Sequence, residues 1–267
     1  MATTATNDER DDARWARYER DGYLRLGRVL GDEDLRALQE RIDAIMLGQA
    51  ELAYDRLLMQ LDSADGKYEN AGVQSRGFKG ATLAYRKIQD LEHDALFRAF
   101  MERPLFRHLC DRVYGEDTPI AAFRAMFMNK PARQGTLLPW HQDRWTHLDR
   151  DPLITVWTAL DPATRANGCV QVIPGSHKLG LINPDHPSAF LTDEQGRTHA
   201  PDERAEYLEL DAGEDVLLHN WLLHRSDTNA TDIPRRAFSV CYMDARTRAT
   251  NGETYTPLFG AAAPAAA

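Results

Sequence analysis

The sequence predicts a mainly β protein with flanking helices, in which a jelly-roll core carries an N-terminal helical layer. Two observations lead to this prediction. Helical periodicity is confined to residues before Tyr114, and short strand-like runs separated by turn residues follow from Ile120 onward. Helices followed by strands indicate two packed layers, and many short strands with turns between them are typical of a sandwich or closed barrel. The 267 residues fit one such domain, 1–267.

The helical layer is predicted from apolar residues at helical spacing. Residues 14–20 are expected to form a short helix, followed by a strand over 23–26. Asp32 is expected to cap a second helix, and residues 91–114 read as a third. The glycine-containing stretch 47–80 reads as loop with short helical or strand pieces. The predicted apolar faces are Leu35, Leu38, Ile42, Ile45 and Met46 in the second helix, and Leu96, Phe97, Phe100, Leu105, Leu109 and Val113 in the third.

Seven strands are expected in the second part of the chain, each bounded by Gly, Pro or Asn/Asp turns. A polar insertion at 178–206 interrupts them, and a loop of that length inside a compact domain is more often a lid or binding loop than filler. The first and last residues, 1–10 and 260–267, are expected to be disordered. The predicted strands cover residues 121–130, 135–142, 153–160, 168–174, 207–210, 215–219 and 237–244.

Composition argues against several classes of protein. The net charge is −9 and no run is rich in Lys or Arg, so we expect no nucleic-acid partner. No apolar run approaches 18 residues, and the polar N-terminus lacks the apolar segment of a signal peptide, so we expect a cytoplasmic protein with no membrane partner. The cysteines Cys110, Cys169 and Cys241 form no CxxC motif, which fits a reducing compartment. The sequence leaves the oligomeric state open.

The segment His141-Gln142-Asp143 points most directly to chemistry. Side chains alternate along a strand, so His141 and Asp143 are predicted to share one face. An imidazole and a carboxylate side by side are two thirds of the 2-His-1-carboxylate triad that holds non-haem Fe(II). A His-x-Asp pair alone is more often a simple hydrogen-bonded pair, so the hypothesis needs a third ligand downstream.

Two histidines, His219 and His224, compete as that third ligand. They are five residues apart and would face opposite ways on one continuous strand. His224 is favoured because Arg235 follows it, and the planar guanidinium of an arginine binds a carboxylate with two parallel hydrogen bonds. His219 is then expected to be a buried or supporting histidine. Arg236 alternates with Arg235 and is expected to point away from the site as a surface charge.

Five segments, in this order, resemble the phytanoyl-CoA dioxygenase family of Fe(II)- and 2-oxoglutarate-dependent oxygenases. They are His141-Gln142-Asp143, WTAL at 157–160, NGC at 167–169, IPGSH at 173–177 and the stretch 224–236. The resemblance runs from about Gly22 to about Tyr242. It implies a double-stranded β-helix (cupin-like) with Fe(II) at its mouth and 2-oxoglutarate and O₂ as cosubstrates. It also implies that a small-molecule substrate is hydroxylated while succinate and CO₂ form.

The resemblance implies a role for eight residues. In the family pattern three positions ligate iron, one arginine holds the distal carboxylate of 2-oxoglutarate, and one serine donates a hydrogen bond to that carboxylate. Three further positions line the cosubstrate pocket, and Arg86 is a rival for the lysine among them. Carried over by position, the ligands are His141, Asp143 and His224, the carboxylate-binding residues are Arg235 and Ser226, and the pocket residues are Lys87, Met126 and Trp157.

Several alternatives stay open. Family members that halogenate have Gly or Ala in place of the carboxylate ligand, so Asp143 disfavours halogenation. The same iron site is compatible with desaturation, cyclisation or epimerisation, because each begins with hydrogen abstraction. A catalytically silent cupin-like binding protein is an alternative from a different class. The stretches 47–80 and 178–206 are expected to cover the substrate, and the candidates for contacts at the barrel mouth are Trp145, His147 and Arg246.

Overall fold

The computed structural model describes residues 7–260, and their side chains from residue 11 onward. The first helix begins at Asn7, so the expected disorder of residues 1–10 is wrong for 7–10. Gly260 is likewise placed, directly after the last strand. The rest of the two segments expected to be disordered, 1–6 and 261–267, lies outside the described residues. No helix in the described part of the chain is both long and apolar enough to cross a membrane.

The order of elements follows the prediction, with helices mostly before the strands. The elements are α1 (Asn7–Asp21), β1 (Tyr23–Arg28), α2 (Asp32–Met46), β2 (Leu58–Leu61), β3 (Ser75–Arg76), β4 (Tyr85–Gln89), α3 (Ala95–Met101), α4 (Pro104–Tyr114), β5 (Ile120–Lys130), β6 (Leu138–His141), β7 (Ile154–Ala159), β8 (Val170–Val172), α5 (Asp193–His199), β9 (Glu206–Leu208), β10 (Glu214–His219), β11 (His224–Ser226), β12 (Arg235–Asp244) and β13 (Thr256–Phe259).

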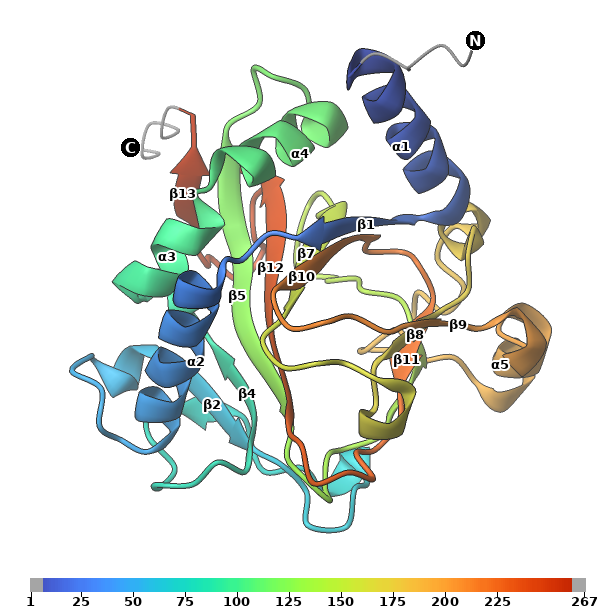
Figure 1. Cartoon of the computed structure of the whole chain (residues 1–267). Coiled ribbons are helices and arrows are strands. Elements are labelled where there is room, and N and C mark those ends of the chain that lie inside the picture. The colour runs from blue at the N-terminus through green and yellow to red at the C-terminus, as the bar shows by residue number, and fades with distance from the viewer. Residues whose placement is uncertain (1–6, 261–267) are drawn as a thin grey trace, which may run out of the picture.

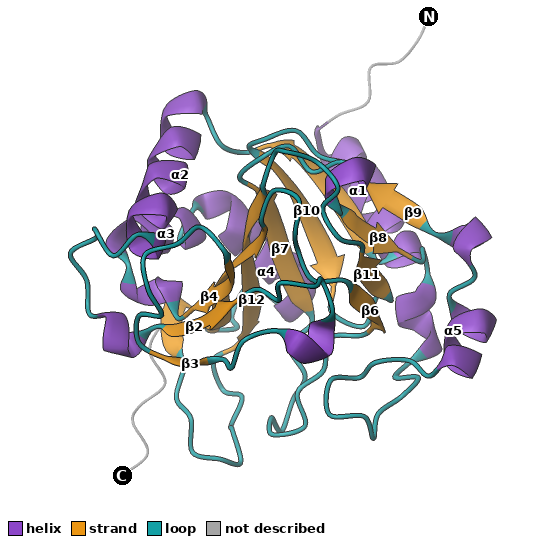
Figure 2. Cartoon of the chain, turned by 90° about the horizontal axis from the view of Figure 1, so that it is seen from below, coloured by secondary structure: helices purple, strands orange, loops and turns teal. Residues whose placement is uncertain are grey.

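The strands form two antiparallel sheets, as a jelly roll requires. Within residues 7–260 the larger sheet has the order β1-β10-β7-β12-β5-β4-β2-β3, with β13 also paired to β5. The smaller sheet has the order β6-β11-β8-β9. Many neighbours in both sheets, such as β1 and β10 or β6 and β11, are far apart in sequence, which is typical of this topology. Both sheets occupy the centre of the molecule, with α2 and α3 on one side and α5 on the other (Figure 2).

Side-chain alternation along β12 explains how the large sheet serves two purposes. Phe238, Val240 and Tyr242 point to one face and pack in the main core with apolar residues of α1, α2, α3 and α4. Of these helices, α2, α3 and α4 lie around β5, and α1 lies beside β1 (Figure 1). The alternate residues Ser239 and Cys241 point to the opposite face and line a cavity. The helical layer thus buries one face of the sheet and leaves the other for the site.

The second helix agrees with its predicted apolar face but not with its predicted cap. Its five apolar residues are all buried. Asp32 is the first helical residue, and the capping position is Gly31, which has no side chain to bond the free backbone N–H groups. Asp32 contributes instead as one of three acidic residues in the first turn, where a negative charge is favourable.

The predicted helix over 91–114 is two helices. Asp94 caps α3 by accepting hydrogen bonds from the backbone N–H groups of Leu96 and Phe97. Pro104 then starts α4 at a first-turn position, where its missing N–H and fixed φ are tolerated. The restart changes the phase of the apolar stripe. Leu96 and Leu105 are each 37% exposed as a result, so their predicted place on the buried face was wrong.

The predicted strands after Ile120 all occur, mostly with shorter bounds. The prediction missed β4, β11 and β13, because the first two are short and part-polar and the third follows a turn-rich segment. The insertion at 178–206 contains the helix α5, which the sequence analysis did not predict within this loop. The stretch 47–80 contains β2, β3 and single turns of helix, as expected.

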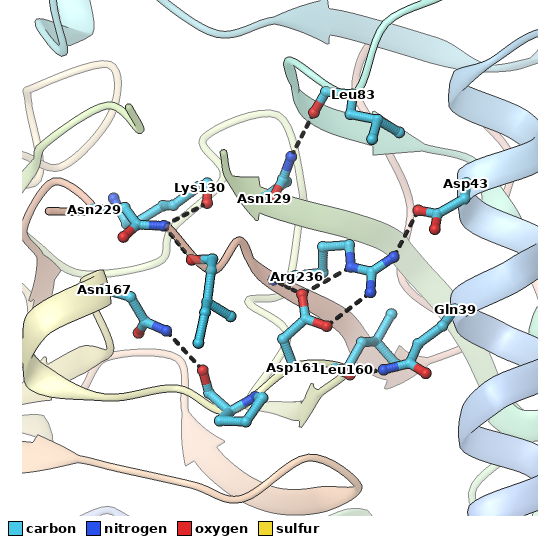
Figure 3. A network of polar contacts seen from close by, with 12 residues as sticks. Gln39, Asp43, Leu83, Asn129, Lys130, Leu160, Asp161, Asn167, Asn229 and Arg236 are labelled. Atoms are coloured by element: carbon cyan, nitrogen blue, oxygen red, sulfur yellow. Dashed lines mark hydrogen bonds and ion pairs between the residues drawn. The ribbon is translucent and has the colours of Figure 1, made fainter. Parts of the chain in front are cut away.

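Arg236 holds the helical layer to the sheet. Its guanidinium donates to both carboxylate oxygens of Asp161, at 2.7 and 2.8 Å, and to Asp43 of α2 at 2.6 Å (Figure 3). Gln39, also on α2, donates to the backbone carbonyl of Leu160 at 2.6 Å. Arg236 therefore points away from the cavity, as alternation predicted. The expectation that it is a surface charge was wrong, because its side chain is only 14% exposed.

The Asn-Gly-Cys segment is a turn that only glycine fits. The Asn167 amide donates to the carbonyl of Pro162 at 2.8 Å and its side chain takes part in a capping box with Thr164 (Figure 3). Gly168 follows with a φ of 79°, and a Cβ there would lie 2.4 Å from the carbonyl oxygen of Asp227. The turn therefore lets β8 pair with β11, the strand that begins at His224.

Candidate active site

A cavity of about 250 Å³ opens between the two sheets. The inner faces of β5, β7 and β12 form one wall, and β6, β8 and β11 form the other. All eight residues that the family resemblance singled out line it: His141, Asp143, His224, Arg235, Ser226, Lys87, Met126 and Trp157. Residues that are up to 148 positions apart in the sequence are therefore brought together by the sheet pairing.

The three candidate metal ligands converge at this cavity. His141 ends β6 and His224 begins β11, and the two residues are partners in the antiparallel ladder. Their ring centroids are 4.0 Å apart. Asp143 lies two residues beyond the strand end, not on the strand as expected, and its carboxylate oxygens are 4.0 Å from His141 Nε2 and 3.9 Å from His224 Nε2. One ligand atom from each residue lies within 4.8 Å of the others.

Both imidazoles are oriented by the backbone. His141 Nδ1 is 2.8 Å from the carbonyl oxygen of Pro139, and His224 Nδ1 is 2.9 Å from that of Leu222. A carbonyl only accepts, so each Nδ1 carries a proton and each Nε2 is the nitrogen that can face a metal. Burial, with His224 nearby, lowers the pKa of His141 to about 3, so this ring is neutral at physiological pH. Two imidazoles and a carboxylate are a suitable donor set for Fe(II).

His219 does not join this group. It is the last residue of β10, whereas His224 starts the separate strand β11, so the two are not on one continuous strand. The His219 ring lies against His177, with centroids 5.0 Å apart, and its Nδ1 accepts from the backbone N–H of Trp221 at 3.0 Å. His177 in turn packs against Gly22 at the end of α1. Both histidines hold the N-terminal helix in place and are not among the residues that line the cavity.

A second polar centre lies at the β12 end of the cavity. Arg235 is 2% exposed, and its Nε and Nη1 have no hydrogen-bond partner among the described residues. Its guanidinium lies 5.4 Å from the ring centroid of Trp157. Burial lowers the pKa of Arg235 to about 10, so it remains charged near neutral pH. A buried cation with unused donors requires an anionic partner, and the buried hydroxyl of Ser226 lines the same region.

Lys87 and not Arg86 lines the main cavity, because alternation along β4 points the two side chains in opposite directions. Arg86 donates to Gln60 at 3.0 Å and lies over the ring of Tyr68. Burial lowers the pKa of Lys87 to about 7, with Arg86 and Arg124 adding to the effect. Met126 lines the cavity from β5, on the same face of the sheet.

Two aromatic residues outside the expected set cover the metal ligands. Phe190, in the 178–206 insertion, forms an isolated bridge with His141, and their rings are 5.5 Å apart. Tyr68, in the 47–80 stretch, meets Phe190 with ring centroids 5.1 Å apart. Both line the cavity. The sequence predicted that these two stretches cover the substrate, but it contained no signal for these two residues.

Arg124 was also missed, although a signal existed. It lines the cavity two residues before Met126 on β5, so the period of two that places Met126 inside also places Arg124 inside.

Trp145, one of the residues expected at the barrel mouth, lines the cavity, and its ring centroid lies 4.5 Å from that of Phe123. His147 is not among the residues that line the cavity, and its Nε2 lies 3.6 Å from a carboxylate oxygen of Glu253.

The third mouth candidate, Arg246, is outside the site. Its guanidinium pairs with the carboxylate of Asp244 at 2.7 Å, and its side chain is 54% exposed. It is not among the residues that line the cavity.

Comparison with known proteins is consistent with this geometry. The phytanoyl-CoA dioxygenase (PhyH) family matches residues 18–237. The chain belongs to this family. A probable phytanoyl-CoA dioxygenase of Caenorhabditis elegans is 28% identical over 238 residues, which cover 84% of this chain and 72% of that protein. Like its family, the protein is a non-haem Fe(II)- and 2-oxoglutarate-dependent oxygenase.

Solved structures support the jelly-roll core of this PhyH-family chain. The 2-oxoglutarate-dependent carbocyclase SnoK from nogalamycin biosynthesis is 19% identical with a TM-score of 0.68, over 97% of this chain and 98% of SnoK. EctD from S. alaskensis, solved with 2-oxoglutarate and 5-hydroxyectoine, is 18% identical with a TM-score of 0.67, over 96% of this chain and 82% of EctD. At such identities the likeness concerns the fold, and the activities of these proteins are their own.

Proposed function

We propose that this protein hydroxylates a small-molecule substrate, with His141, Asp143 and His224 holding Fe(II) and with Arg235 and Ser226 holding 2-oxoglutarate. The observation that carries the proposal is the pairing of two incomplete sites in one cavity. One is the set of three ligand atoms within 4.8 Å of each other. The other is the buried guanidinium of Arg235, which has two unpartnered nitrogens. Together they match a metal and a dicarboxylate.

Each protein group has a physical task in this proposal. The carbonyls of Pro139 and Leu222 fix the imidazoles so that both Nε2 atoms face the metal position. The guanidinium of Arg235 binds the distal carboxylate of 2-oxoglutarate through charge-assisted hydrogen bonds. When bound, iron and 2-oxoglutarate supply the activation of O₂, with release of succinate and CO₂. The protein positions the substrate carbon and excludes water from the cavity.

Hydroxylation is favoured over halogenation because Asp143 occupies the carboxylate position and leaves no ligand position for chloride. Desaturation, cyclisation and epimerisation share the same iron site. Product mass distinguishes them, since hydroxylation adds one oxygen atom to the substrate and the three others do not.

The test begins with metal binding. Fe(II) stoichiometry is measured without O₂ in the parent and in His141→Ala, His224→Ala and His219→Ala variants. We expect the first two to lose iron or bind it at least about tenfold more weakly, because each removes one of three ligands. The His219→Ala variant is the matched control and should keep its iron, with thermal melting used to confirm that it folds.

Enzyme activity is then measured as succinate formed from 2-oxoglutarate over a metabolite panel. A parent that binds Fe(II) but forms no succinate with any compound would support the silent binding protein instead. A His224→Ala variant that keeps iron, together with a His219→Ala variant that loses it, would show that the third ligand is misassigned.

A further inference from the structure

The charges that line the cavity are opposite in sign to the charge of the chain. The protein carries a net charge of −9. The cavity, by contrast, is lined by five cationic side chains and a single carboxylate, that of Asp143. The five cations are Lys87, Arg124, Arg144, Arg225 and Arg235. A concave site with an excess of one charge favours ligands of the opposite charge.

Four of these cations already have a partner or a task. Arg235 faces 2-oxoglutarate in the proposal above. Arg225 donates to Asp202 at 2.8 Å and to Gln171 at 2.9 Å. Arg144 donates through Nη1 to the backbone carbonyl of Pro184 at 3.0 Å, and its buried Nε has no partner among the described residues. Lys87 lines the cavity from β4 and belongs to the positions that the family pattern assigns to the cosubstrate pocket.

Arg124 remains with neither a protein partner nor an assigned task. Its half-buried guanidinium forms no ion pair and no hydrogen bond with any group of residues 11–260. It lies over a pair of aromatic rings that contact each other, 5.3 Å from the centroid of Phe123 and 5.0 Å from that of Trp145. Such packing orients a guanidinium while leaving its N–H groups free. The group is therefore pre-positioned for a ligand that the protein itself does not supply.

The position of Arg124 is separate from that of the cosubstrate. Arg235 pairs with Lys130 on β5, and Cys241 pairs with Arg124, so the two arginines lie six residues apart along the strands. At about 3.3 Å per residue this is roughly 20 Å. Asp143 is close enough to Lys87 and to Cys241 for its charge to act on both. Lys87 is the strand partner of Met128, and Cys241 is the strand partner of Arg124. The metal ligands thus lie over the β5 stretch between the two ends.

We propose, on the basis of the oxygenase function proposed above, that Arg124 binds the carboxylate of the substrate and that the substrate is a small organic acid. The acid enters from the end of the cavity opposite to Arg235. Its carboxylate forms charge-assisted hydrogen bonds to the guanidinium of Arg124, and the remainder of the molecule extends toward the metal ligands. Arg124 thereby decides which carbon of the acid lies next to the metal.

The experiment uses matched pairs of compounds and variants. Aliphatic, aromatic, amino and peptidyl acids, each beside its neutral primary amide, are titrated without O₂ into protein loaded with Fe(II) and 2-oxoglutarate, and binding is measured by calorimetry. The variants are Arg124→Gln, Arg124→Lys and Arg150→Gln. The last is a control arginine that is exposed and paired with Asp244. Succinate and product are then measured with O₂ for every compound that binds.

We expect acids but not their amides to bind the parent. Arg124→Gln should weaken acid binding about 10- to 100-fold, the loss expected when a charge-assisted contact is removed. The acid affinity of Arg124→Lys should lie between those of the parent and Arg124→Gln, and Arg150→Gln should bind acids as tightly as the parent. For a turned-over acid, Arg124→Gln should raise its KM more than it lowers kcat.

Several results would overturn the assignment. They are equal binding of amides and acids, parent-like acid binding by Arg124→Gln, no binding of any acid in the panel, and a raised requirement for 2-oxoglutarate instead of for the acid in Arg124→Gln. Failure of the oxygenase proposal is recognised separately. In that case the parent forms no succinate with any compound, whether or not acids bind at Arg124.

Discussion

The ring of Tyr68 meets the ring of Phe190 edge to face, with centroids 5.1 Å apart and an interplanar angle of 78°. This contact joins the 47–80 stretch to the 178–206 insertion above the metal ligands. Phe190 also packs against His141, and Arg86 lies over Tyr68 at 4.9 Å. The two loop segments therefore meet at the site instead of lying on the surface independently. We expect their junction to keep water out of the cavity.

Removing this junction is predicted to uncouple the reaction. In Phe190→Ala, 2-oxoglutarate should still be consumed, because the residues proposed to hold iron and 2-oxoglutarate are intact. Substrate oxidation should fall, because the cavity is open to water at the position of the lost ring. The measurement is the ratio of product to succinate, which should drop at least about threefold, as expected when a lid no longer excludes water.

Leu179→Ala provides the control, since Leu179 belongs to the same insertion but is 53% exposed. Its ratio should equal that of the parent. Shortening the whole 178–206 segment should uncouple at least as strongly as Phe190→Ala. An unchanged ratio and an unchanged substrate KM in both variants would mean that the insertion does not cover the substrate.

Arg235→Met is predicted to weaken 2-oxoglutarate binding while iron binding stays nearly intact. The substitution removes the counter-charge for a carboxylate in a buried pocket, a loss of about 1.5–3 kcal/mol, or roughly 10- to 150-fold in affinity. Binding of 2-oxoglutarate without O₂ and the KM for 2-oxoglutarate both measure the effect. An unchanged affinity would contradict the role assigned to Arg235.

Arg236→Met is predicted to act on stability instead. It leaves the carboxylate of Asp161, whose side chain is 8% exposed, without its partner. Breaking a buried ion pair by removing one side costs about 3–5 kcal/mol in the free energy of unfolding. Chemical denaturation measures this loss. Asp43→Asn is the milder comparison at the exposed end of the same network, and a large rise in the KM for 2-oxoglutarate in Arg236→Met would show that the two arginines have been exchanged.

Asp215 is predicted to make stability depend on pH. It is fully buried on β10 opposite Thr158, and burial raises its pKa to about 8. The folded state therefore holds a proton that the unfolded chain releases near pH 4. The stability contributed by this proton is fully present below about pH 4 and is lost as the pH rises toward 8.

Asp215→Asn keeps the shape of the protonated acid and cannot ionise. Its free energy of unfolding should change less than that of the parent between pH 5 and pH 8. At the higher pH the variant should therefore become more stable relative to the parent than it is at pH 5. Denaturation at the two pH values measures this. Parallel pH profiles for parent and variant would show that Asp215 is not protonated in the folded state.

Much of the site is determined by local patterns in the sequence. The alternation of Arg235 and Arg236 sends one guanidinium to the cavity and the other to the helical layer. This follows from the period of two in extended backbone, which needs no tertiary information. The His-x-Asp motif identified two residues that meet at the cavity, although Asp143 lies beyond the end of β6 and not on the strand. The order of helices first and strands second likewise indicates the two layers. Local pattern was less reliable at boundaries, where Pro104 divides one predicted helix into two.

Tertiary structure decided the rest. His224 meets His141 only because β11 pairs with β6, strands that are more than 80 residues apart in sequence. The partner of Arg236 on α2, the contact of Tyr68 with Phe190 and the lone guanidinium of Arg124 in the cavity depend on pairings between distant segments. Sequence periodicity states which way a side chain points from its own strand, but not which segment lies opposite. That choice is made when the two sheets close around the cavity, because only then do distant side chains share a buried space.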